Sequence, residues 1–172
     1  MIIWLTGLSG SGKTTIGRQV LRQWKDKNTN VVFVDGDEVR ALLDLHQGDD
    51  RYTLAGRRVV ADKIHNLCAW LDQQDVNVVC CTISLFEDLH LKNRQIFSDY
   101  FEVFLSVPMD ELYRRDNKNL YAPALRGELK NVIGVDIPYN PPTDPHMTID
   151  NSTHKKGFAK IAAEILSKAL PL

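Results

Sequence analysis

A glycine-rich segment near the N-terminus has a composition suited to binding phosphate. Residues 7–14 read Gly-Leu-Ser-Gly-Ser-Gly-Lys-Thr and fit the pattern G-x-x-x-x-G-K-[ST]. The glycines let successive backbone N–H groups turn toward one anion, and a following helix adds its dipole. Lys13 can reach the β- and γ-phosphates of ATP, and Thr14 can ligate Mg²⁺. The predicted nucleotide-binding residues are Gly7, Ser9, Gly10, Ser11, Gly12, Lys13, Thr14 and Thr15.

Two carboxylates could supply the rest of a phosphoryl-transfer site. Asp35 and Asp37 follow the apolar run 31–34, which is typical of a buried strand. We expect Asp37 to act as the base that accepts the proton of an attacking hydroxyl, and Asp35 to support the metal with Thr14 or to support the structure. The reverse assignment of the two carboxylates stays open. The alternative is an Asp-Gly turn whose aspartate caps the next helix, and Asp37 could combine capping with a position facing the substrate.

Positively charged side chains could clamp the phosphate oxygens, since charge accumulates on those oxygens during transfer. The candidates are Arg40, Arg57, Arg58, Arg114, Arg115 and Arg126. Each of them could instead be a solvated surface group. The five histidines show neither a catalytic triad nor metal-ligand spacing, so we expect them on the surface or in loops.

The elements that must hold these residues alternate between strand and helix patterns along the whole chain. This alternation predicts an α/β fold with a parallel sheet in one domain, residues 1–172. Strands are predicted at 2–5, 31–34, 76–83, 101–107 and 147–149, and helices within 16–24, 39–43, 60–71, 89–97, 110–115 and 158–169. Residues 46–53 are expected to form a polar loop. Ligands of such sheets bind beyond the carboxyl ends of the strands, where the glycine-rich loop and both aspartates fall.

Residues 116–145 differ from the rest because they hold five of the seven prolines and show little periodicity. A segment of this length without regular structure is usually functional in a compact domain, so we predict an active-site lid.

Composition limits the class of protein. The 172 residues carry a formal net charge of −1, which favours neither nucleic acid nor an anionic membrane as a partner. No apolar run approaches a membrane span or a signal peptide, and Cys68, Cys80 and Cys81 lack metal-ligand spacing. We therefore expect a cytoplasmic protein with buried free thiols.

The ordered set of motifs resembles the adenylylsulfate kinases, which use ATP to phosphorylate the ribose 3′-hydroxyl of adenosine 5′-phosphosulfate. The matching segments are the phosphate loop at 7–15, Asp-Gly-Asp-Glu-Val-Arg at 35–40, the arginine pair at 57–58, Arg-Asp-Asn-Lys-Asn-Leu-Tyr at 115–121, and Gly-Val-Asp at 134–136 with the prolines after it. The resemblance implies a P-loop NTPase fold, with a five-stranded parallel sheet, helices on both faces and a lid. It implies ATP and Mg²⁺ as cofactors and allows a homodimer, although no interface pattern indicates one.

By the same resemblance, Asp37 faces the 3′-hydroxyl, Arg40 and the Arg57-Arg58 pair bind the substrate, and Arg115 lies near the ATP adenine. The departures from the family concern the acceptor. The family holds the substrate adenine between two phenylalanines, and Thr82 and Val132 stand at those positions here. The residues predicted to bind the acceptor are Asp37, Glu38, Arg40, Arg57, Arg58, Thr82, Ser84, Val132 and Ile133.

Losing both aromatic faces removes base stacking worth roughly 1–3 kcal/mol per base. Glu38 replaces the family's asparagine, and residues 121–125 lack the family's cations, with Arg126 one place late. One relative of the family, cytidine diphosphoramidate kinase of capsule phosphoramidate synthesis, acts on a cytidine nucleotide. A smaller pyrimidine held by polar groups such as Thr82 and Glu38 would suit these changes, so cytidine diphosphoramidate is the favoured acceptor.

Other functions stay open. Adenylylsulfate itself could be the acceptor if another aromatic residue, such as Phe86, takes over the stacking. A GTPase-like switch would need Asn-Lys-x-Asp, and the nearest string, at 117–120, lacks the aspartate. A non-catalytic nucleotide-binding module would bind ATP without transfer, which the intact Lys13, Thr14, Asp35 and Asp37 disfavour.

Overall fold

A five-stranded parallel sheet forms the centre of the molecule. The computed structural model describes residues 1–27, 30–45, 49–116, 118–153 and 157–170. The strands are β1 (Ile2–Thr6), β2 (Val31–Asp35), β3 (Asn77–Cys81), β4 (Tyr100–Ser106) and β5 (Met147–Asp150). They lie in the order β2-β3-β1-β4-β5, and every pair is parallel. The predicted sheet is therefore confirmed.

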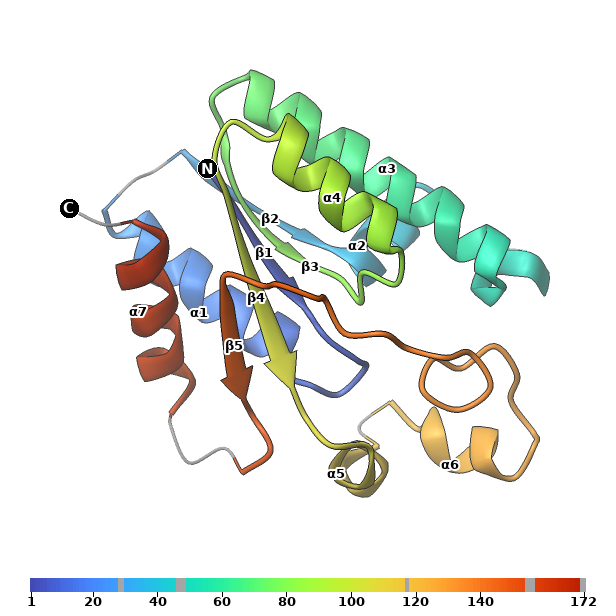
Figure 1. Ribbon diagram of the computed structural model, residues 1–172. Coiled ribbons are helices and arrows are strands. Elements are labelled where there is room, and N and C mark those ends of the chain that lie inside the picture. The colour runs from blue at the N-terminus through green and yellow to red at the C-terminus, as the bar shows by residue number, and fades with distance from the viewer. Residues whose placement is uncertain (28–29, 46–48, 117, 154–156, 171–172) are drawn as a thin grey trace.

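Helices cover both faces of this sheet. The helices α1 (Lys13–Lys25) and α7 (Phe158–Ala169) lie on one face, and α3 (Leu54–Gln73) and α4 (Glu87–Ile96) lie on the other (Figure 1). The shorter helices are α2 (Gly36–Leu42), α5 (Met109–Arg115), α6 (Tyr121–Leu125) and a 3₁₀ helix at Asp49–Tyr52. Helices α2 and α5 follow the carboxyl ends of β2 and β4, α6 lies in the predicted lid, and the 3₁₀ helix precedes α3. The predicted site lies at the carboxyl ends of these strands.

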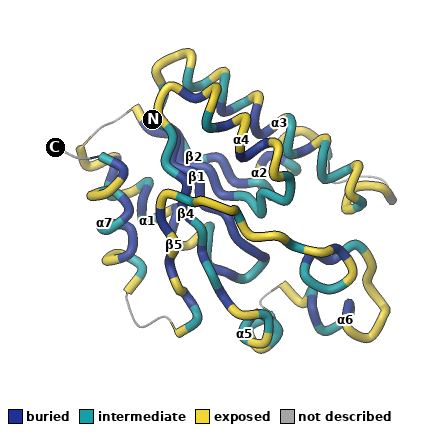
Figure 2. Tube along the Cα trace, viewed as in Figure 1, coloured by how far each residue is buried: buried dark blue, intermediate teal, exposed yellow. Residues whose placement is uncertain are grey.

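Strand β1 is buried along its whole length, as Figure 2 shows for the centre of the sheet. Its side chains alternate between the two layers, as strand geometry requires. Ile3 and Leu5 join the core beneath α1 and α7, whereas Ile2 and Trp4 join the core beneath α3. The continuous apolar run of the sequence thus reflects a central strand covered on both faces.

The predicted lid, residues 116–145, contains more structure than its sequence suggests. Its helix α6 begins where the Asp116 carboxylate accepts hydrogen bonds from the N–H groups of Leu120, Tyr121 and Ala122, at 2.7, 3.0 and 3.0 Å. The lid also forms a third apolar cluster with residues of the glycine-rich loop and α5, which includes Leu8, Leu112, Tyr121, Val132, Ile133 and Ile137. A five-residue helix is too short to leave a periodic pattern in the sequence.

Several expectations need correction. The predicted loop 46–53 contains the 3₁₀ helix Asp49–Tyr52, and 46–48 lie outside the described residues. Strand β3 ends at Cys81, two residues earlier than predicted, which leaves Thr82 in the following loop. The expectation that the histidines are superficial is wrong for His65 and His90, which are 2% and 8% exposed. His46 and His154 are not among the described residues.

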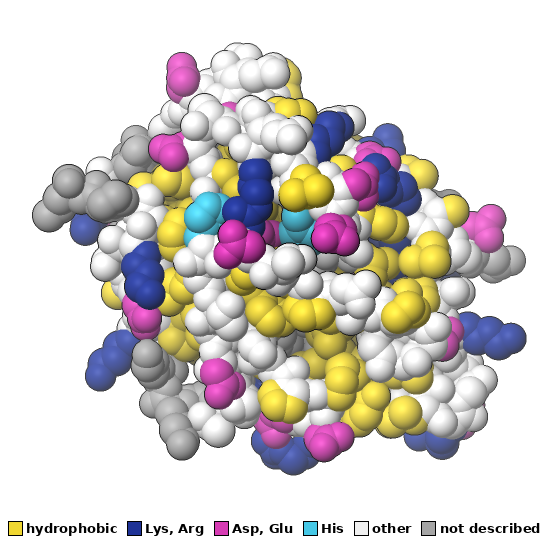
Figure 3. All heavy atoms as spheres, viewed as in Figure 1, with side chains coloured by type: hydrophobic (Ala, Val, Ile, Leu, Met, Phe, Trp, Pro, Cys, Tyr) yellow, Lys and Arg dark blue, Asp and Glu magenta, His cyan; other side chains and the backbone are white. Residues whose placement is uncertain are grey.

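The three cysteines are free and buried, as predicted. Figure 3 shows one face of the molecule, on which acidic, basic and hydrophobic side chains are interspersed. Within the described ranges, none of the helices combines the length and the apolar character that a membrane crossing requires.

Gly17 allows α1 to lie close to the sheet, and this contact is testable. A Cβ at this position would overlap the Cys81 sulfur and approach the Phe33 ring to 3.0 Å. Gly17→Ala should therefore lower the free energy of unfolding by about 1–2 kcal/mol, because overpacking of about 1–3 kcal/mol exceeds the helix propensity of about 1 kcal/mol that alanine gains. Urea unfolding measures the change.

Two variants make this test specific. Gly157→Ala has open space around its new Cβ among the described residues, so its loss of stability should be limited to the poorer capping of α7 by alanine. Adding Cys81→Ala to Gly17→Ala removes the overlapping sulfur and should restore part of the loss. A Gly17→Ala variant as stable as the original chain would contradict this account of the packing.

Candidate active site

The carboxyl ends of β1, β2 and β3 meet at one edge of the sheet and open into a cleft. The cleft has a volume of about 520 Å³. Of the predicted site residues, those lining it are Ser9, Gly10, Gly12, Lys13, Thr14, Thr15, Asp35, Asp37, Arg40, Arg57, Thr82, Ser84, Val132 and Ile133. The structure thus brings together segments that are far apart in the sequence. Gly7, Ser11, Glu38, Arg58 and Arg115 do not line this cleft.

The glycine-rich loop between β1 and α1 has the backbone shape that its sequence predicts. Gly7, Gly10 and Gly12 have φ values of 145°, 79° and 99°, which side chains other than glycine disfavour. A Cβ at Gly12 would also lie 2.6 Å from the amide nitrogen of Asn151. Lys13 begins α1, and its Nζ donates to the Leu8 carbonyl at 2.8 Å. The loop therefore meets the helix start at the point where an anion would bind.

Three backbone carbonyls of this loop accept hydrogen bonds from side chains outside it. The pairs are Tyr121 to Ser9 at 2.9 Å, Arg115 to Gly10 at 3.3 Å and Asn151 to Ser11 at 2.8 Å. These bonds orient the peptide groups of the loop. When the carbonyl of a peptide group points to one side of the loop, the N–H of the same group points to the opposite side and is available to an anion. Tyr121 and Asn151 were not predicted to be site residues, since nothing near them in the chain relates them to residues 9–11.

Arg115 is a buried support of the loop. Besides Gly10, its guanidinium donates to the Asn151 carbonyl at 2.6 Å, to the Ser152 carbonyl at 2.8 Å and to Glu111 at 2.7 Å. Four of its five N–H donors are thus engaged by protein groups in this structure. The contact of Arg115 with the ATP adenine, which the resemblance implies, stays a prediction.

Asp35 connects the glycine-rich loop with α2. Its Oδ2 accepts the Thr14 hydroxyl at 2.7 Å, and its Oδ1 accepts the backbone N–H of Asp37 at 2.9 Å, so Asp35 caps α2. The capping residue is thus Asp35 and not Asp37. Oxygen donors of this kind suit Mg²⁺, a hard cation that usually retains water and phosphate ligands. Among the described residues there is no group of three or more His, Cys, Asp or Glu residues that could hold a metal by itself.

Asp37 lies in the cleft and forms an ion pair with Lys118 of the lid. Partial desolvation in the cleft raises the pKa of this carboxyl, but the hydrogen bond and the charge of Lys118 outweigh that effect and hold the pKa below its usual range. Asp37 is therefore a carboxylate at neutral pH. Lys118 falls within the lid motif, yet its contact with Asp37 was not evident from the sequence.

Arg40 and Arg57 form a cationic cluster on the cleft wall together with Arg51. The three guanidinium groups lie 5.3–5.4 Å from the centre of the Tyr52 ring, within cation–π range. Arg57 also donates to the Asn131 carbonyl at 2.7 Å, which ties α3 to the lid. Burial lowers the pKa of both Arg40 and Arg57, and the nearby charge of Arg40 adds to the lowering at Arg57. Neighbouring cations with reduced hydration are suited to an anionic ligand.

Four predicted residues have ion-pair partners outside the cleft. The pairs are Glu38 with Arg18 at 2.7 Å, Arg58 with Asp88 at 2.7 Å, Arg114 with Glu111 at 2.8 Å and Arg126 with Glu128 at 2.8 Å. The structure does not bring Glu38 or Arg58 into the cleft with the other candidates. Charged surface residues have many partners available, and spacing in the sequence does not select one.

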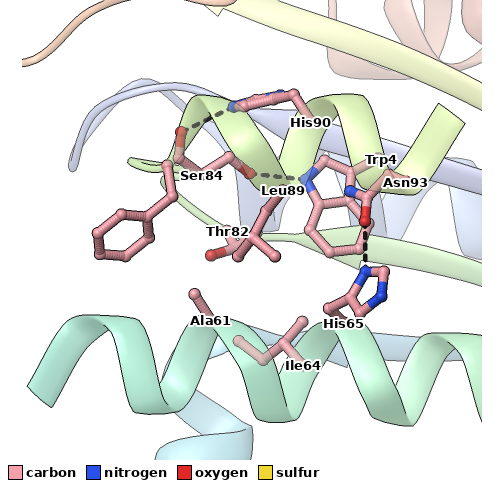
Figure 4. Close-up of a pocket in the computed structure, with 10 residues that line it drawn as sticks. Trp4, Ala61, Ile64, His65, Thr82, Ser84, Leu89, His90 and Asn93 are labelled. Atoms are coloured by element: carbon pink, nitrogen blue, oxygen red, sulfur yellow. Dashed lines mark hydrogen bonds between the residues drawn. The ribbon is translucent and has the colours of Figure 1, made fainter. Parts of the chain in front are cut away.

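The end of the cleft beyond β3 continues into a side cavity of about 20 Å³ (Figure 4). Residues that line both spaces are Ala61, Ile64, Thr82, Ser84 and Phe86. Within the described part of the chain, the Thr82 hydroxyl has no hydrogen-bond partner. Val132 and Ile133 approach the cleft from the lid. The two positions that lack the family's phenylalanines thus line one cleft.

Comparisons with known proteins agree with this geometry. Residues 1–150 match the family model of adenylylsulphate kinase. The chain is 39% identical over 171 residues to a cytidine diphosphoramidate kinase of Campylobacter jejuni, covering 99% of this chain and 96% of the relative. It is 35% identical over 164 residues to an adenylyl-sulfate kinase of Halothermothrix orenii, covering 92% and 85% of the two chains.

A solved structure has the same architecture over nearly the whole chain. The APS kinase of Mycobacterium tuberculosis, solved in complex with AMPPNP and APS, superposes with a TM-score of 0.84 at 28% identity. The superposition covers 97% of this chain and 95% of that structure. With its phosphate loop, paired aspartates and lid, this chain belongs to the adenylylsulphate kinase family of P-loop enzymes, which transfer phosphate to a hydroxyl group.

Proposed function

We propose that this enzyme uses Mg-ATP to phosphorylate the ribose 3′-hydroxyl of a small nucleotide, and that its acceptor is cytidine diphosphoramidate. The observation that carries the choice of acceptor is the pair Thr82 and Val132, which line the cleft where the family has two phenylalanines. Without the aromatic faces, an adenine loses its stacking partners. A smaller base can still bind through hydrogen bonds to side chains at the cleft wall.

The similarity to the Campylobacter jejuni cytidine diphosphoramidate kinase supports the same acceptor, because it extends over 99% of this chain. The Thr82 hydroxyl faces a space shared by the cleft and the side cavity, and in the described residues it has no partner of its own. A free hydroxyl there could pair with a polar atom of a pyrimidine. A phenylalanine at this position could offer only stacking.

In the proposed reaction, the loop amides and Lys13 bind the β- and γ-phosphates of ATP. Thr14 and Asp35 are the residues that would hold Mg²⁺, directly or through its water shell, and the ion would neutralise charge on the phosphates. Tyr121, Arg115 and Asn151 keep the loop carbonyls away from the phosphates. Arg40 and Arg57 would bind the anionic end of the acceptor, since both line the cleft.

Asp37 would orient the ribose hydroxyl and accept its proton as the new P–O bond forms. Its lowered pKa makes it a weak base before the reaction begins. This suits phosphoryl transfer, whose loose transition state requires little removal of the nucleophile's proton before the bond to the leaving group breaks. Lys118 would leave Asp37 and pair with the incoming phosphates instead. Both side chains of the ion pair are mostly exposed, so the pair contributes little free energy and is easily broken.

The second candidate is adenylylsulfate as the acceptor. One observation favours it: Phe86 lines both the cleft and the side cavity, so an aromatic residue is available near the missing phenylalanines. A coupled ADP-release assay with both compounds tests the two candidates. Turnover of cytidine diphosphoramidate alone supports the proposal, whereas turnover of adenylylsulfate alone would overturn it. Turnover of neither, despite ATP binding, would require another acceptor nucleotide.

Restoring both aromatic residues should change the preference for the acceptor base. Thr82→Phe combined with Val132→Phe should raise kcat/KM for adenylylsulfate about 10- to 100-fold relative to the cytidine compound, from stacking worth roughly 1–3 kcal/mol. Val59→Phe, on the exposed side of α3, serves as the control for an added aromatic ring. An unchanged ratio of the two kcat/KM values would argue against these positions as the base site.

Removing the charge of Asp37 separates transfer from nucleotide binding. We expect Asp37→Asn to lower kcat about 10²- to 10⁴-fold, the usual contribution of a positioned base, while the Kd for ATP changes little. Steady-state kinetics and calorimetric titration measure the two quantities. Asp110→Asn, on the exposed first turn of α5, is the matched control. Normal turnover by Asp37→Asn would rule out this role.

Lys13 should make ATP binding sensitive to alkaline pH. Burial lowers the pKa of Lys13 to about 8 in the free protein. Bound phosphate favours the charged amine, so ATP binding above pH 8 must restore a proton. The Kd for ATP should therefore rise between pH 8 and 9.5, by up to tenfold per pH unit. Lys13→Arg stays charged and should show weaker binding with little pH dependence over this range. A constant Kd in the original chain would contradict the lowered pKa.

A further inference from the structure

Ser84 is held between two side chains at the wall of the cleft. Its φ of 54° lies in the left-handed region, which is uncommon for residues other than glycine. The Trp4 indole Nε1 donates to the Ser84 hydroxyl oxygen at 2.6 Å, and His90 Nε2 lies 2.9 Å from the Ser84 carbonyl oxygen. Figure 4 shows both contacts beside the side cavity, with Thr82 next to them. Together they fix the backbone and the hydroxyl oxygen of Ser84.

The chemistry of these groups determines where the hydrogens lie. An indole N–H can only donate, so the Ser84 oxygen accepts from Trp4 and its own O–H remains available to donate. No further partner of that hydroxyl occurs among the described residues. A carbonyl oxygen can only accept, so Nε2 of His90 carries a hydrogen. Ser84 therefore presents a donor at a position that lines both the cleft and the side cavity.

The other nitrogen of His90 contacts a fully buried carboxylate. Nδ1 pairs with Glu102 of β4, whose side chain also accepts from Arg94 at 2.8 Å and from the Tyr100 hydroxyl at 3.2 Å. A carboxylate already paired with an arginine accepts from Nδ1, so both nitrogens of His90 donate. Burial opposes a charged ring, but the hydrogen bond and the charge of Glu102 outweigh it and raise the pKa of His90.

The elements around this pair contain few other groups that titrate. Arg94 and His90 come from α4, and Tyr100 and Glu102 come from β4. His146 precedes β5 and accepts from the Glu102 backbone N–H at 3.0 Å, while the carbonyl of Asp144 accepts from Arg94. Burial and the nearby charge of Arg94 lower the pKa of His146, so a positive charge on the His146 ring is unfavourable. His90 is therefore the histidine of this cluster that carries the charge.

We propose that His90, held as an imidazolium by Glu102, is a positioning residue that aims the Ser84 hydroxyl at a hydrogen-bond acceptor on the base of the acceptor nucleotide. The matching ligand chemistry is a base edge with a ring carbonyl or an unprotonated ring nitrogen, as a pyrimidine presents. This inference rests on the proposed function and adds to it the group that reads the base. Trp4 orients the donor, and Glu102 keeps His90 charged.

The main test compares Ser84→Ala and His90→Phe with the original chain, using cytidine diphosphoramidate and adenylylsulfate at saturating ATP. Loss of one neutral hydrogen bond should raise KM for the preferred acceptor about five- to tenfold. We expect kcat at saturating acceptor and KM for ATP to stay within about twofold. Because both variants remove one interaction, the double variant should be no worse than the single ones. An unchanged acceptor KM in Ser84→Ala would overturn the proposal.

Two further variants exclude a general effect of altering the cavity. His90→Gln can donate to the Ser84 carbonyl without a charge and should recover part of the acceptor KM. His65→Gln alters the other buried histidine of the cavity, which pairs with Asn93 at 2.7 Å and does not contact Ser84. It should leave the acceptor KM unchanged. An equal rise of KM in His65→Gln would overturn the specific role of His90.

The pH dependence adds a readout that a purely structural role would not change. Because the pKa of His90 is raised, its charged form is complete at low pH and is lost as pH rises through that pKa. The acceptor KM of the original chain should rise over the same interval, and that of His90→Gln should not. A ¹⁵N NMR titration of the whole protein should show His90 losing its second ring proton at a higher pH than an ordinary imidazole does, because its pKa is raised. If neither acceptor is turned over, the proposed function fails. A His90 ring that loses this proton at or below the pH of an ordinary imidazole would overturn the positioning role separately.

Discussion

The hydrogen bond between Asp35 and Thr14 joins the two halves of the active site. One oxygen of Asp35 holds the hydroxyl at the start of α1, and the other caps α2. A single carboxylate thus sets the nucleotide-binding loop against the helix that carries Asp37 and Arg40. Its position follows from the parallel register in which Asp35 lies beside Cys81 at the carboxyl end of the sheet. Every distance in the proposed transfer depends on this junction, because the loop proposed to bind ATP and the helix proposed to face the acceptor lie on either side of it.

Buried polar groups hold the rest of the site in place. Asn151 and Arg115 donate hydrogen bonds to carbonyls of the glycine-rich loop. His90, paired with Glu102, bonds the Ser84 carbonyl in the loop after β3. Burying such groups costs free energy unless their hydrogen bonds are complete. Each charged member of the two groups has several partners, which offset its cost of burial and restrict its orientation. Asn151 is only partly satisfied, because its buried Oδ1 has no partner among the described residues. Both loops at the cleft therefore have backbone shapes, including the left-handed Ser84, that isolated peptides would rarely adopt.

The lid combines an apolar anchor with a weak polar contact. Its cluster around Leu112, Tyr121 and Ile133 is buried against α5 and the glycine-rich loop, which keeps the segment close to that loop. Lys118 reaches Asp37 across the cleft with both side chains largely exposed, and such an ion pair contributes little free energy. The lid can therefore stay attached to the domain while Lys118 and Asp37 change partners when substrates bind.

The sequence was sufficient to predict the sheet, the helices on its faces and the glycine-rich loop, because local periodicity and glycine spacing encode those features. It also indicated that Thr82 and Val132 differ from the family. Three further features became evident from the structure alone. Arg58 and Glu38 pair outside the cleft, Tyr121 and Asn151 donate to the loop carbonyls, and His90 is buried against Glu102. These contacts join residues 12 to 140 positions apart or select one partner among several nearby charges, and a linear pattern contains neither kind of information.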